Sequence, residues 1–299
     1  TTSVAAGNGA ESDGHYRGLA PDARLVLVRV GDPKTGRIAE ADIARGLTWL
    51  VDHAADLNVR VVNVSLGGDR PAPSDANPVD PLVEQLVEAG ITVVVASGNE
   101  GRREIVPPGS APSAITVGGI DDANSVERAA ASDWRSNFGP TADGVMKPEV
   151  VAPSIWVAAP VLLGSEVHER ASAIFQLLST PDEELPVRAA ALAAPLGLSA
   201  EQIAGDAAGV RHAVAALRRE MKLLTAHYQH VEGTSFAAPI VTGLVAQMLE
   251  VNAALTPAEI KGILMATATG LPQVDREVQG AGVVNPALAL DLAARSSRG

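Results

Sequence analysis

Short apolar runs alternate with amphipathic stretches over the first 120 residues, and this alternation constrains the fold more than any other feature. Four runs rich in Val and Ile have the length of strands: residues 24–30, 59–64, 91–96 and 114–117. Residues 40–57 and 81–89 repeat apolar side chains at helical spacing. Strands separated by helices predict a parallel sheet with helices on both faces.

Small polar residues follow two of these strand-like runs. Residues 65–68 (SLGG) follow the second run, and residues 97–99 (SGN) follow the third. In open α/β sheets, ligands bind outside the carboxyl ends of the strands. The sequence therefore predicts that both segments lie at a binding edge.

Residues 161–230 differ in composition from the rest, because they are rich in Ala, Leu, Glu and Arg. Three prolines interrupt them: Pro181, Pro186 and Pro195. Two stretches have the pattern of amphipathic helices: residues 166–178 and 208–224. Ser199 and Gln202 have the spacing of a capping box. We interpret this region as a helical insertion, followed by three predicted helices: residues 235–251, 257–268 and 285–294.

Composition excludes several classes of function. The formal net charge of −12 repels phosphate backbones, which disfavours nucleic acid as a partner. The chain has no Cys, so disulfides, thiolate zinc sites and thiol catalysis are excluded. No apolar run reaches the roughly 20 residues that a membrane span needs. The chain begins at Thr1 rather than Met, and we do not treat Thr1 as a natural N-terminus.

Residues 233–239 (GTSFAAP) form the sharpest local motif. A turn of small residues opens a predicted helix with Ser235 at its start. The positive helix end suits a nucleophile whose attack creates an oxyanion. An ordinary serine N-cap explains the same pattern, and the motif alone leaves both interpretations open. The motif is not Gly-x-Ser-x-Gly, which disfavours an α/β-hydrolase.

Residues 96–101 (ASGNEG) form a second motif, after a buried strand. The amide of Asn99 can donate a hydrogen bond to developing negative charge. A Gly-Asn turn is common, and taken alone this motif favours the turn.

Several segments, which follow one another along the chain in the family's order, together resemble the subtilase family of serine proteases. They are residues 2–9 with 16–21, 62–67 (VNVSLG), 98–99 (GN), 147–153 (KPEVVAP), 233–239 (GTSFAAP) and 280–285 (GAGVVN). The resemblance extends through most of the chain. It implies a three-layer α/β/α subtilisin-like fold with a mostly parallel sheet, lacking its N-terminal strand or strands. Residues 1–299 would form one partial catalytic domain, with the helical insertion at about 161–230.

The resemblance also implies roles for the matched residues. Ser235 would attack the scissile carbonyl as the catalytic nucleophile, and Asn99 with the Ser235 backbone N–H would hold the oxyanion. Two segments would line the bound polypeptide substrate: Ser65, Leu66 and Gly67 on one side, and Ala96, Ser97 and Gly98 on the other. Secretion is a family expectation.

The sequence departs from the family pattern in the residues that would act as the catalytic general base and its partner, His and Asp. The family order is Asp, His, Asn, Ser, and its His-Gly-Thr motif should come immediately before Thr1 or Thr2. None of the six histidines is followed by Gly-Thr: His15, His53, His168, His212, His227 and His230. We therefore expect the catalytic His and Asp upstream of Thr1. We expect the chain alone to be badly impaired as an endopeptidase.

The sequence leaves open an alternative function, a possible Ca²⁺ site and the role of the insertion. The rival is a non-catalytic peptide-binding pseudoprotease, whereas an α/β-hydrolase or dinucleotide enzyme lacks its fingerprints here. Structural Ca²⁺ near residues 75–80 or 121–122 is a family possibility, but no ligand spacing supports it and a solvated acidic surface is favoured. We assign no metal ligand and no cofactor. The insertion is either a helical cover or subunit contact near the cleft or, as we favour, a peripheral addition.

Overall fold

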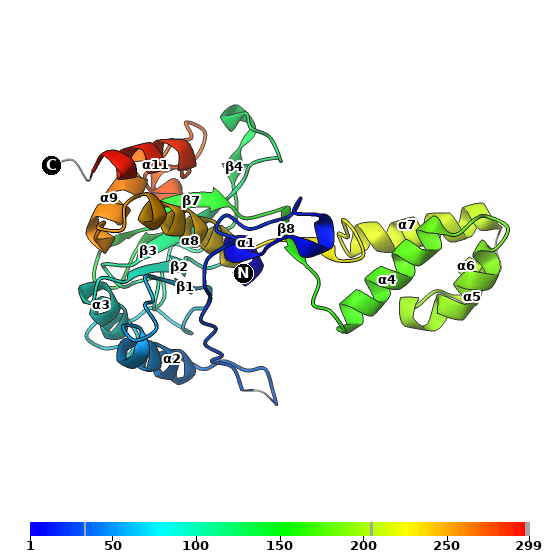
Figure 1. Cartoon of the computed structure of the whole chain (residues 1–299), viewed down its shortest axis with the longest axis horizontal. Coiled ribbons are helices and arrows are strands. Elements are labelled where there is room, and N and C mark those ends of the chain that lie inside the picture. The colour runs from blue at the N-terminus through cyan, green and yellow to red at the C-terminus, as the bar shows by residue number, and fades with distance from the viewer. Residues whose placement is uncertain (33, 204–205, 297–299) are drawn as a thin grey trace. The chain divides into compact units, whose positions relative to one another are not determined.

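The computed structural model describes residues 1–32, 34–203 and 206–296, without the side chain of Arg128, and it divides into two compact units (Figure 1). Unit 1 comprises Thr1–Asn8, Arg17–Val157 and Glu232–Gly299. Unit 2 comprises Gly9–Tyr16 and Ala158–Val231.

A mostly parallel sheet forms the centre of unit 1. Its four parallel strands run in the order β1 (Val61–Val64), β2 (Thr92–Ala96), β3 (Ile115–Asp121) and β7 (Val150–Pro153). The short β4 (Ser132–Asp133) pairs antiparallel with the end of β3. The predicted parallel α/β sheet is thereby confirmed.

Helices cover both faces of this sheet, which gives the three layers expected. One face carries α8 (Thr234–Val251), backed by α9 (Pro257–Thr267) and α11 (Pro286–Arg295). The other carries α2 (Glu40–His53) and α3 (Asp80–Glu88). The remaining elements of unit 1 are short: α1 (Thr2–Ala6), η2 (Arg128–Ala130), β5 (Gly139–Pro140), β6 (Met146–Lys147) and α10 (Arg276–Gln279).

Strand β2 shows why a nearly continuous apolar run is needed at the centre of the sheet. Val94 joins the apolar cluster under α8, whereas Val93 and Val95 join the cluster under α2 and α3. Side chains alternate between the faces of a strand, so a strand buried on both faces is apolar at nearly every position, with the buried Thr92 as the polar exception in β2.

Helix α8 is long and apolar enough to cross a membrane by length and composition alone, and 56% of the relevant window is buried inside the protein. Ten of its residues are buried, including Val241, Leu244 and Met248 in the cluster over the sheet. This burial is that of the central helix of a folded domain.

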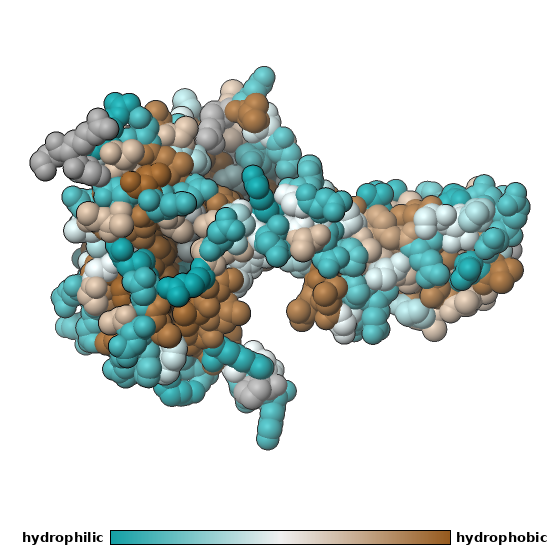
Figure 2. All heavy atoms as spheres, viewed as in Figure 1, coloured by the Kyte–Doolittle hydropathy of each residue, from teal (hydrophilic) through white to brown (hydrophobic). Residues whose placement is uncertain are grey.

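Residues 24–30 do not form the strand predicted for them. They make no backbone–backbone hydrogen bond with any described residue, and within the described part of the chain β1 pairs only with β2. Val28 packs with the cluster under α2, but Leu25 is 52% and Leu27 74% exposed. Figure 2 shows apolar surface over the part of unit 1 where this segment runs toward α2. The prediction was wrong because a strand exists only where another strand pairs with it.

The described residues of unit 2 form the helices α4 (Glu166–Ser179), α5 (Leu185–Leu196), α6 (Ala200–Ile203) and α7 (Ala207–Glu220), and α4, α5 and α7 surround an apolar cluster of their own. Unit 2 also contains η1 (Ala10–Ser12), and most of the strand pair β8 (Val157–Pro160) and β9 (Tyr228–Val231). The capping box is confirmed, because Ser199 N–H donates to Gln202 Oε1 (2.8 Å) and Gln202 N–H to Ser199 Oγ (3.3 Å).

Two features of unit 2 differ from the sequence interpretation. Helix α5 includes Pro186 and Pro195, which we read as breaks. Pro186 lies in the first turn, where an N–H has no intrahelical acceptor, and Pro195 lies in the last. Residues 9–16 also belong to this unit, with the Tyr16 and Tyr228 ring centroids 4.8 Å apart.

A buried ionic cluster in unit 1 joins β6, the residue before β7, and α9. Lys147 Nζ and Lys261 Nζ each lie 2.7 Å from Glu149 Oε1, and each donates to the carbonyl of Ala114. Glu149 Oε2 accepts from the N–H of Thr116 (2.7 Å). Burial lowers the pKa of Lys147 to about 8, against the opposing effect of Glu149.

This lowered pKa predicts a pH dependence of stability. Between pH 8 and pH 10.5 the unfolded chain keeps the Lys147 proton that the folded chain has lost, so the free energy of unfolding rises with pH. Lys147→Met should remove this contribution, about 3 kcal/mol across the window. Urea denaturation at several pH values measures it, with Lys34→Met at an exposed lysine as the control. Equal slopes in the parent and Lys147→Met would contradict the assignment.

Candidate active site

Ser235 is the second residue of α8, directly after the turn at Gly233. Gly233 has φ +134°, a conformation that L side chains rarely adopt, and its N–H donates to the carbonyl of Ser154 (2.7 Å). N–H groups in the first turn of a helix have no intrahelical acceptor and point toward the helix N-terminus. The half-buried Ser235 therefore lies where a helix best stabilises negative charge.

Side chains in and directly after β1 attach the end of that strand to the start of α8. Ser235 Oγ donates to the carbonyl of Ser65 (3.4 Å), and Ser65 Oγ donates to the carbonyl of Ser235 (3.1 Å). Asn63 links the two elements again, since its amide donates to Ser65 Oγ (2.9 Å) and its Oδ1 accepts from Thr242 Oγ1 (3.0 Å). The partner of the Ser235 hydroxyl is thus a backbone carbonyl and not a base.

Asn99, after β2, is held against the same helix end by Thr234. Asn99 Oδ1 accepts from Thr234 N–H (2.9 Å) and from Thr234 Oγ1 (2.9 Å). Thr234 Oγ1 also accepts from the N–H of Gly98 (3.2 Å). With Oδ1 occupied by two donors, the amide orientation is fixed and Nδ2 is left as the donor of this side chain.

The two predicted lining segments begin where regular pairing between β1 and β2 ends. The last pair is Val64 with Val95, so Ser65, Leu66 and Gly67 lie beyond the ladder. Leu66 packs on the cluster under α2, and Gly67 is exposed.

The other segment stays closer to the sheet. Ala96 pairs with Val117 and packs on the cluster under α8, and Ser97 is buried with its N–H bonded to the Val117 carbonyl (3.0 Å). Gly98 reaches Thr234 through the contact given above. The structure therefore brings Ser65, Gly98 and Asn99 to the start of α8, and leaves Leu66 and Ala96 as supports on the two cores.

Sequence reasoning gave no role to three residues that organise this region. Thr234 lay inside the quoted motif, and its place directly before Ser235 was a usable signal. Asn63 was an internal polar residue in an apolar strand, which also marks a specific partner. Asn137 contacts the loop of Asn99 although it lies 38 residues later in the sequence, and no local sequence pattern predicts this contact.

The six histidines are divided between the two units. Five of them fall in the segments of unit 2, and His53 lies on α2 in unit 1. His53 is exposed and stacks on Trp49, with ring centroids 4.6 Å apart. The described residues of unit 1 therefore place no histidine beside Ser235.

The acidic segments give no metal site. No group of three or more His, Asp or Glu side chains among the described residues is arranged to hold a metal ion. The solvated surface that we favoured is wrong for Asp80, which is fully buried and accepts from Ser110 Oγ (2.7 Å) and Asn77 Nδ2 (3.1 Å). Burial raises the pKa of Asp80, and the side chain joins α3 to the loop of Ser110.

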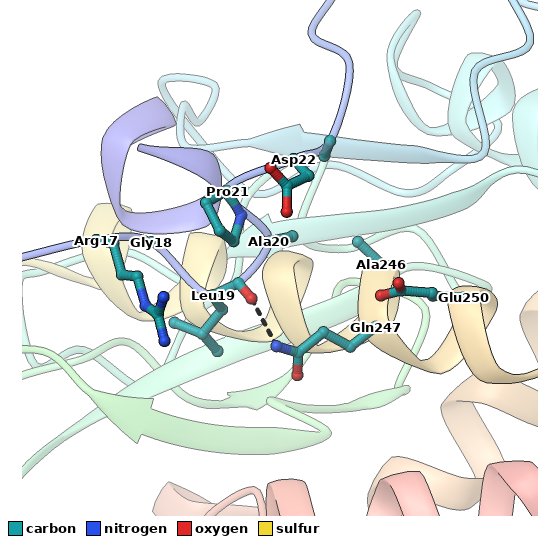
Figure 3. A pocket seen from close by; sticks show the side chains of 10 residues that line it. Arg17, Gly18, Leu19, Ala20, Pro21, Asp22, Ala246, Gln247 and Glu250 are labelled. Carbon is teal, nitrogen blue, oxygen red and sulfur yellow. Dashed lines mark hydrogen bonds between the residues drawn. The ribbon is translucent and has the colours of Figure 1, made fainter. Parts of the chain in front are cut away.

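A hollow in unit 1 lies apart from these residues (Figure 3). Residues 17–23 form one wall, and Ala246, Gln247 and Glu250 of α8 form the other. Gln247 Nε2 donates to the carbonyl of Leu19 across it. Gln247 is 12 residues after Ser235, about 18 Å along the helix, so the hollow is not the candidate site.

The contact of Asn137 with Gly98 yields a stability prediction. Gly98 has φ +111°, and a Cβ there would lie 2.6 Å from Asn137 Nδ2. Gly90 has φ +83° but nothing within 4 Å of an added Cβ. Gly98→Ala should therefore reduce the free energy of unfolding by at least 1 kcal/mol more than Gly90→Ala, about the cost of overpacking. Denaturant melts of both variants decide the point, and equal losses would contradict the close packing.

Comparison with known proteins agrees with this geometry. The model of the subtilase family matches residues 1–282. Serine protease AprX of Bacillus subtilis is 30% identical over 291 residues, covering 94% of this chain and 54% of AprX. The chain thus spans about half the length of that relative.

Solved structures show the same fold. Patellamide maturation protease PatA has a TM-score of 0.62 at 19% identity, covering 98% of this chain and 81% of PatA. Fervidolysin from Fervidobacterium pennivorans, described as a keratinolytic enzyme related to subtilisin, has a TM-score of 0.61 at 21% identity, covering 97% of this chain and 35% of fervidolysin. With the family match over nearly the whole sequence, this chain belongs to the subtilase family, peptidase family S8.

Proposed function

We propose that this chain carries the nucleophile and oxyanion site of a serine endopeptidase that acts through an acyl-enzyme on Ser235. The observation that carries the proposal is the shared position of Ser235 and Asn99 at the start of α8, where Thr234 fixes the Asn99 amide. Membership of the subtilase family supports serine peptidase chemistry in the whole protein.

The proposed reaction has two halves. Ser235 Oγ forms a bond to the scissile carbonyl carbon while its proton passes to a general base. The Ser235 N–H and Asn99 Nδ2 stabilise the oxyanion, after which the C–N bond breaks and the base returns the proton to the leaving amine. Water then releases the acyl group from Ser235 by the same steps in reverse order.

The substrate is a polypeptide bound in extended form. We propose that Ser65, Leu66 and Gly67 pair with its backbone as an added strand. Their place beyond the last β1–β2 pair supports this, because their backbone groups lie outside the ladder. Ala96, Ser97 and Gly98 would line the opposite wall, next to Asn99.

We propose that the base and its orienting carboxylate come from residues outside this sequence, as the resemblance implies. Among the described residues, segment 24–30 and one edge of β1 pair with no strand, and this supports the proposal because both contribute side chains to one apolar cluster: Val28 from the segment, and Val62 and Val64 from β1. A strand that paired with both would complete the sheet beside Ser65. We expect the 299-residue chain alone to be badly impaired.

The helical region also belongs to this proposal. We propose that residues 161–230 are an insertion in the catalytic domain, as their separate apolar cluster supports. A peptide-binding pseudoprotease is the alternative for the whole protein, and the relatives named as serine proteases do not favour it.

Kinetics of the whole protein test the proposal. Ser235→Ala should abolish acyl-enzyme formation and leave a residual rate of roughly 10³–10⁴ over water. Asn99→Ala should lower kcat by about 10²–10³, the range known for this donor in a subtilisin, with little change in KM. The control is Asn58→Ala, at an exposed turn residue. Peptide binding without turnover in the parent would instead establish the pseudoprotease.

The missing strand makes a separate prediction for hydrogen exchange. Amides of residues 24–30 have no backbone acceptor among the described residues and should exchange freely in this chain. In the whole protein a paired strand should slow them by roughly 100-fold or more, as for other buried ladders. Amides of β2, which is paired on both sides, should be protected in both forms. Free exchange of 24–30 in the whole protein would contradict the completed sheet.

A further inference from the structure

Asn137 is a buried side chain that holds the loop on both sides of Asn99. It is 3% exposed and lies two residues before the start of β5. Its Oδ1 accepts from the N–H groups of Glu100 (3.0 Å) and Arg102 (3.2 Å). Its own N–H donates to the carbonyl of Gly98 (3.1 Å). One residue thus fixes the backbone immediately before and immediately after Asn99.

The fit between Asn137 and this loop is close. Gly98 lacks the Cβ that would lie 2.9 Å from Asn137 Cγ, and its φ of +111° turns the chain around the amide. Phe138 N–H donates to the carbonyl of Arg102 (3.0 Å), which extends the contact by one residue. The loop around Asn99 is therefore held by hydrogen bonds to the buried Asn137 and not by pairing with a strand.

The side chain and the backbone of Asn99 are held by different residues. Thr234 donates two hydrogen bonds to the side-chain oxygen of Asn99, whereas Asn137 fixes the backbone around Asn99. Oxyanion stabilisation requires donors within hydrogen-bond distance of the developing charge, and a misplacement of about 1 Å can cost 10²-fold in rate.

We propose that Asn137 is a positioning residue for the oxyanion donor Asn99. It touches neither substrate nor nucleophile, and acts by setting the place of the Asn99 amide. The inference rests on the proposed function of Asn99. A merely structural asparagine would affect stability, with no selective effect on the Asn99-dependent part of catalysis.

A double-mutant cycle in the whole protein tests this role. Asn137→Ala should lower kcat by about 10–100-fold with KM changed less than about threefold, because the interaction is made in the transition state. In an Asn99→Ala background the same substitution should lower kcat by less than about threefold, because its target is gone. An undiminished effect in that background, or no effect in the parent, would overturn the proposal.

Asn252→Ala is the matched control. Asn252 is also buried, donates to the carbonyl of Ala293 (3.1 Å) and accepts from Ala254 N–H (3.1 Å). It follows α8 at the end remote from Ser235. Its loss should reduce stability and leave kcat within about twofold of the parent, as expected for a site without contact with the loop.

A second variant covers the case in which Asn137→Ala does not fold. Asn137→Asp keeps an acceptor oxygen for Glu100 and Arg102, so kcat should stay within about tenfold of the parent and protection of those two amides should persist. A loss of kcat as large as that of Asn99→Ala, with the amides still protected, would overturn the positioning role. If Asn99→Ala itself changes nothing, the proposed function fails instead.

Discussion

The start of α8 is fixed between the carboxyl ends of two parallel strands, and the candidate site depends on that attachment. Ser65 and Asn63 fasten the end of β1 to the helix, and Thr234 fastens it to the loop after β2. Farther along, α8 buries one side against the sheet. The packing of a core helix thereby sets the position of Ser235, and the contacts of Thr234 tie Asn99 to the same helix end.

The parts of this arrangement that could be predicted from sequence are those governed by local patterns. Strand β2 follows from an apolar run buried on both faces, and α2 from the helical spacing of Ile43, Leu47 and Leu50, all of which are buried. The motif around Ser235 predicted the helix start to within one residue, and the family resemblance came from this motif together with the other segments. An ordinary serine N-cap is wrong, because Gly233 is the N-cap of α8 and no side chain caps the helix.

The remainder depends on partners distant in sequence. Residues 24–30 have the composition of a strand but pair with no strand in the part of the chain that the structure describes, and the periodicity of a sequence does not indicate whether a pairing strand is present. Residues 9–16 group with a region beginning about 150 positions later, which no composition shift reveals. Asn137 looks like an ordinary loop residue until its contacts with Glu100 and Arg102 are known. Helix α5 was not predicted because Pro186 and Pro195 were interpreted as breaks, whereas they lie in its first and last turns.

The central claim is that Ser235 is the nucleophile of the whole protein, and covalent labelling addresses it most directly. A peptidyl phosphonate forms a stable bond to an activated serine with loss of its leaving group, and peptide mapping by mass spectrometry locates the adduct. The account predicts one adduct on Ser235, formed far more slowly in the 299-residue chain, and absent after Ser235→Ala. Labelling of another serine with peptide hydrolysis retained in Ser235→Ala would contradict it.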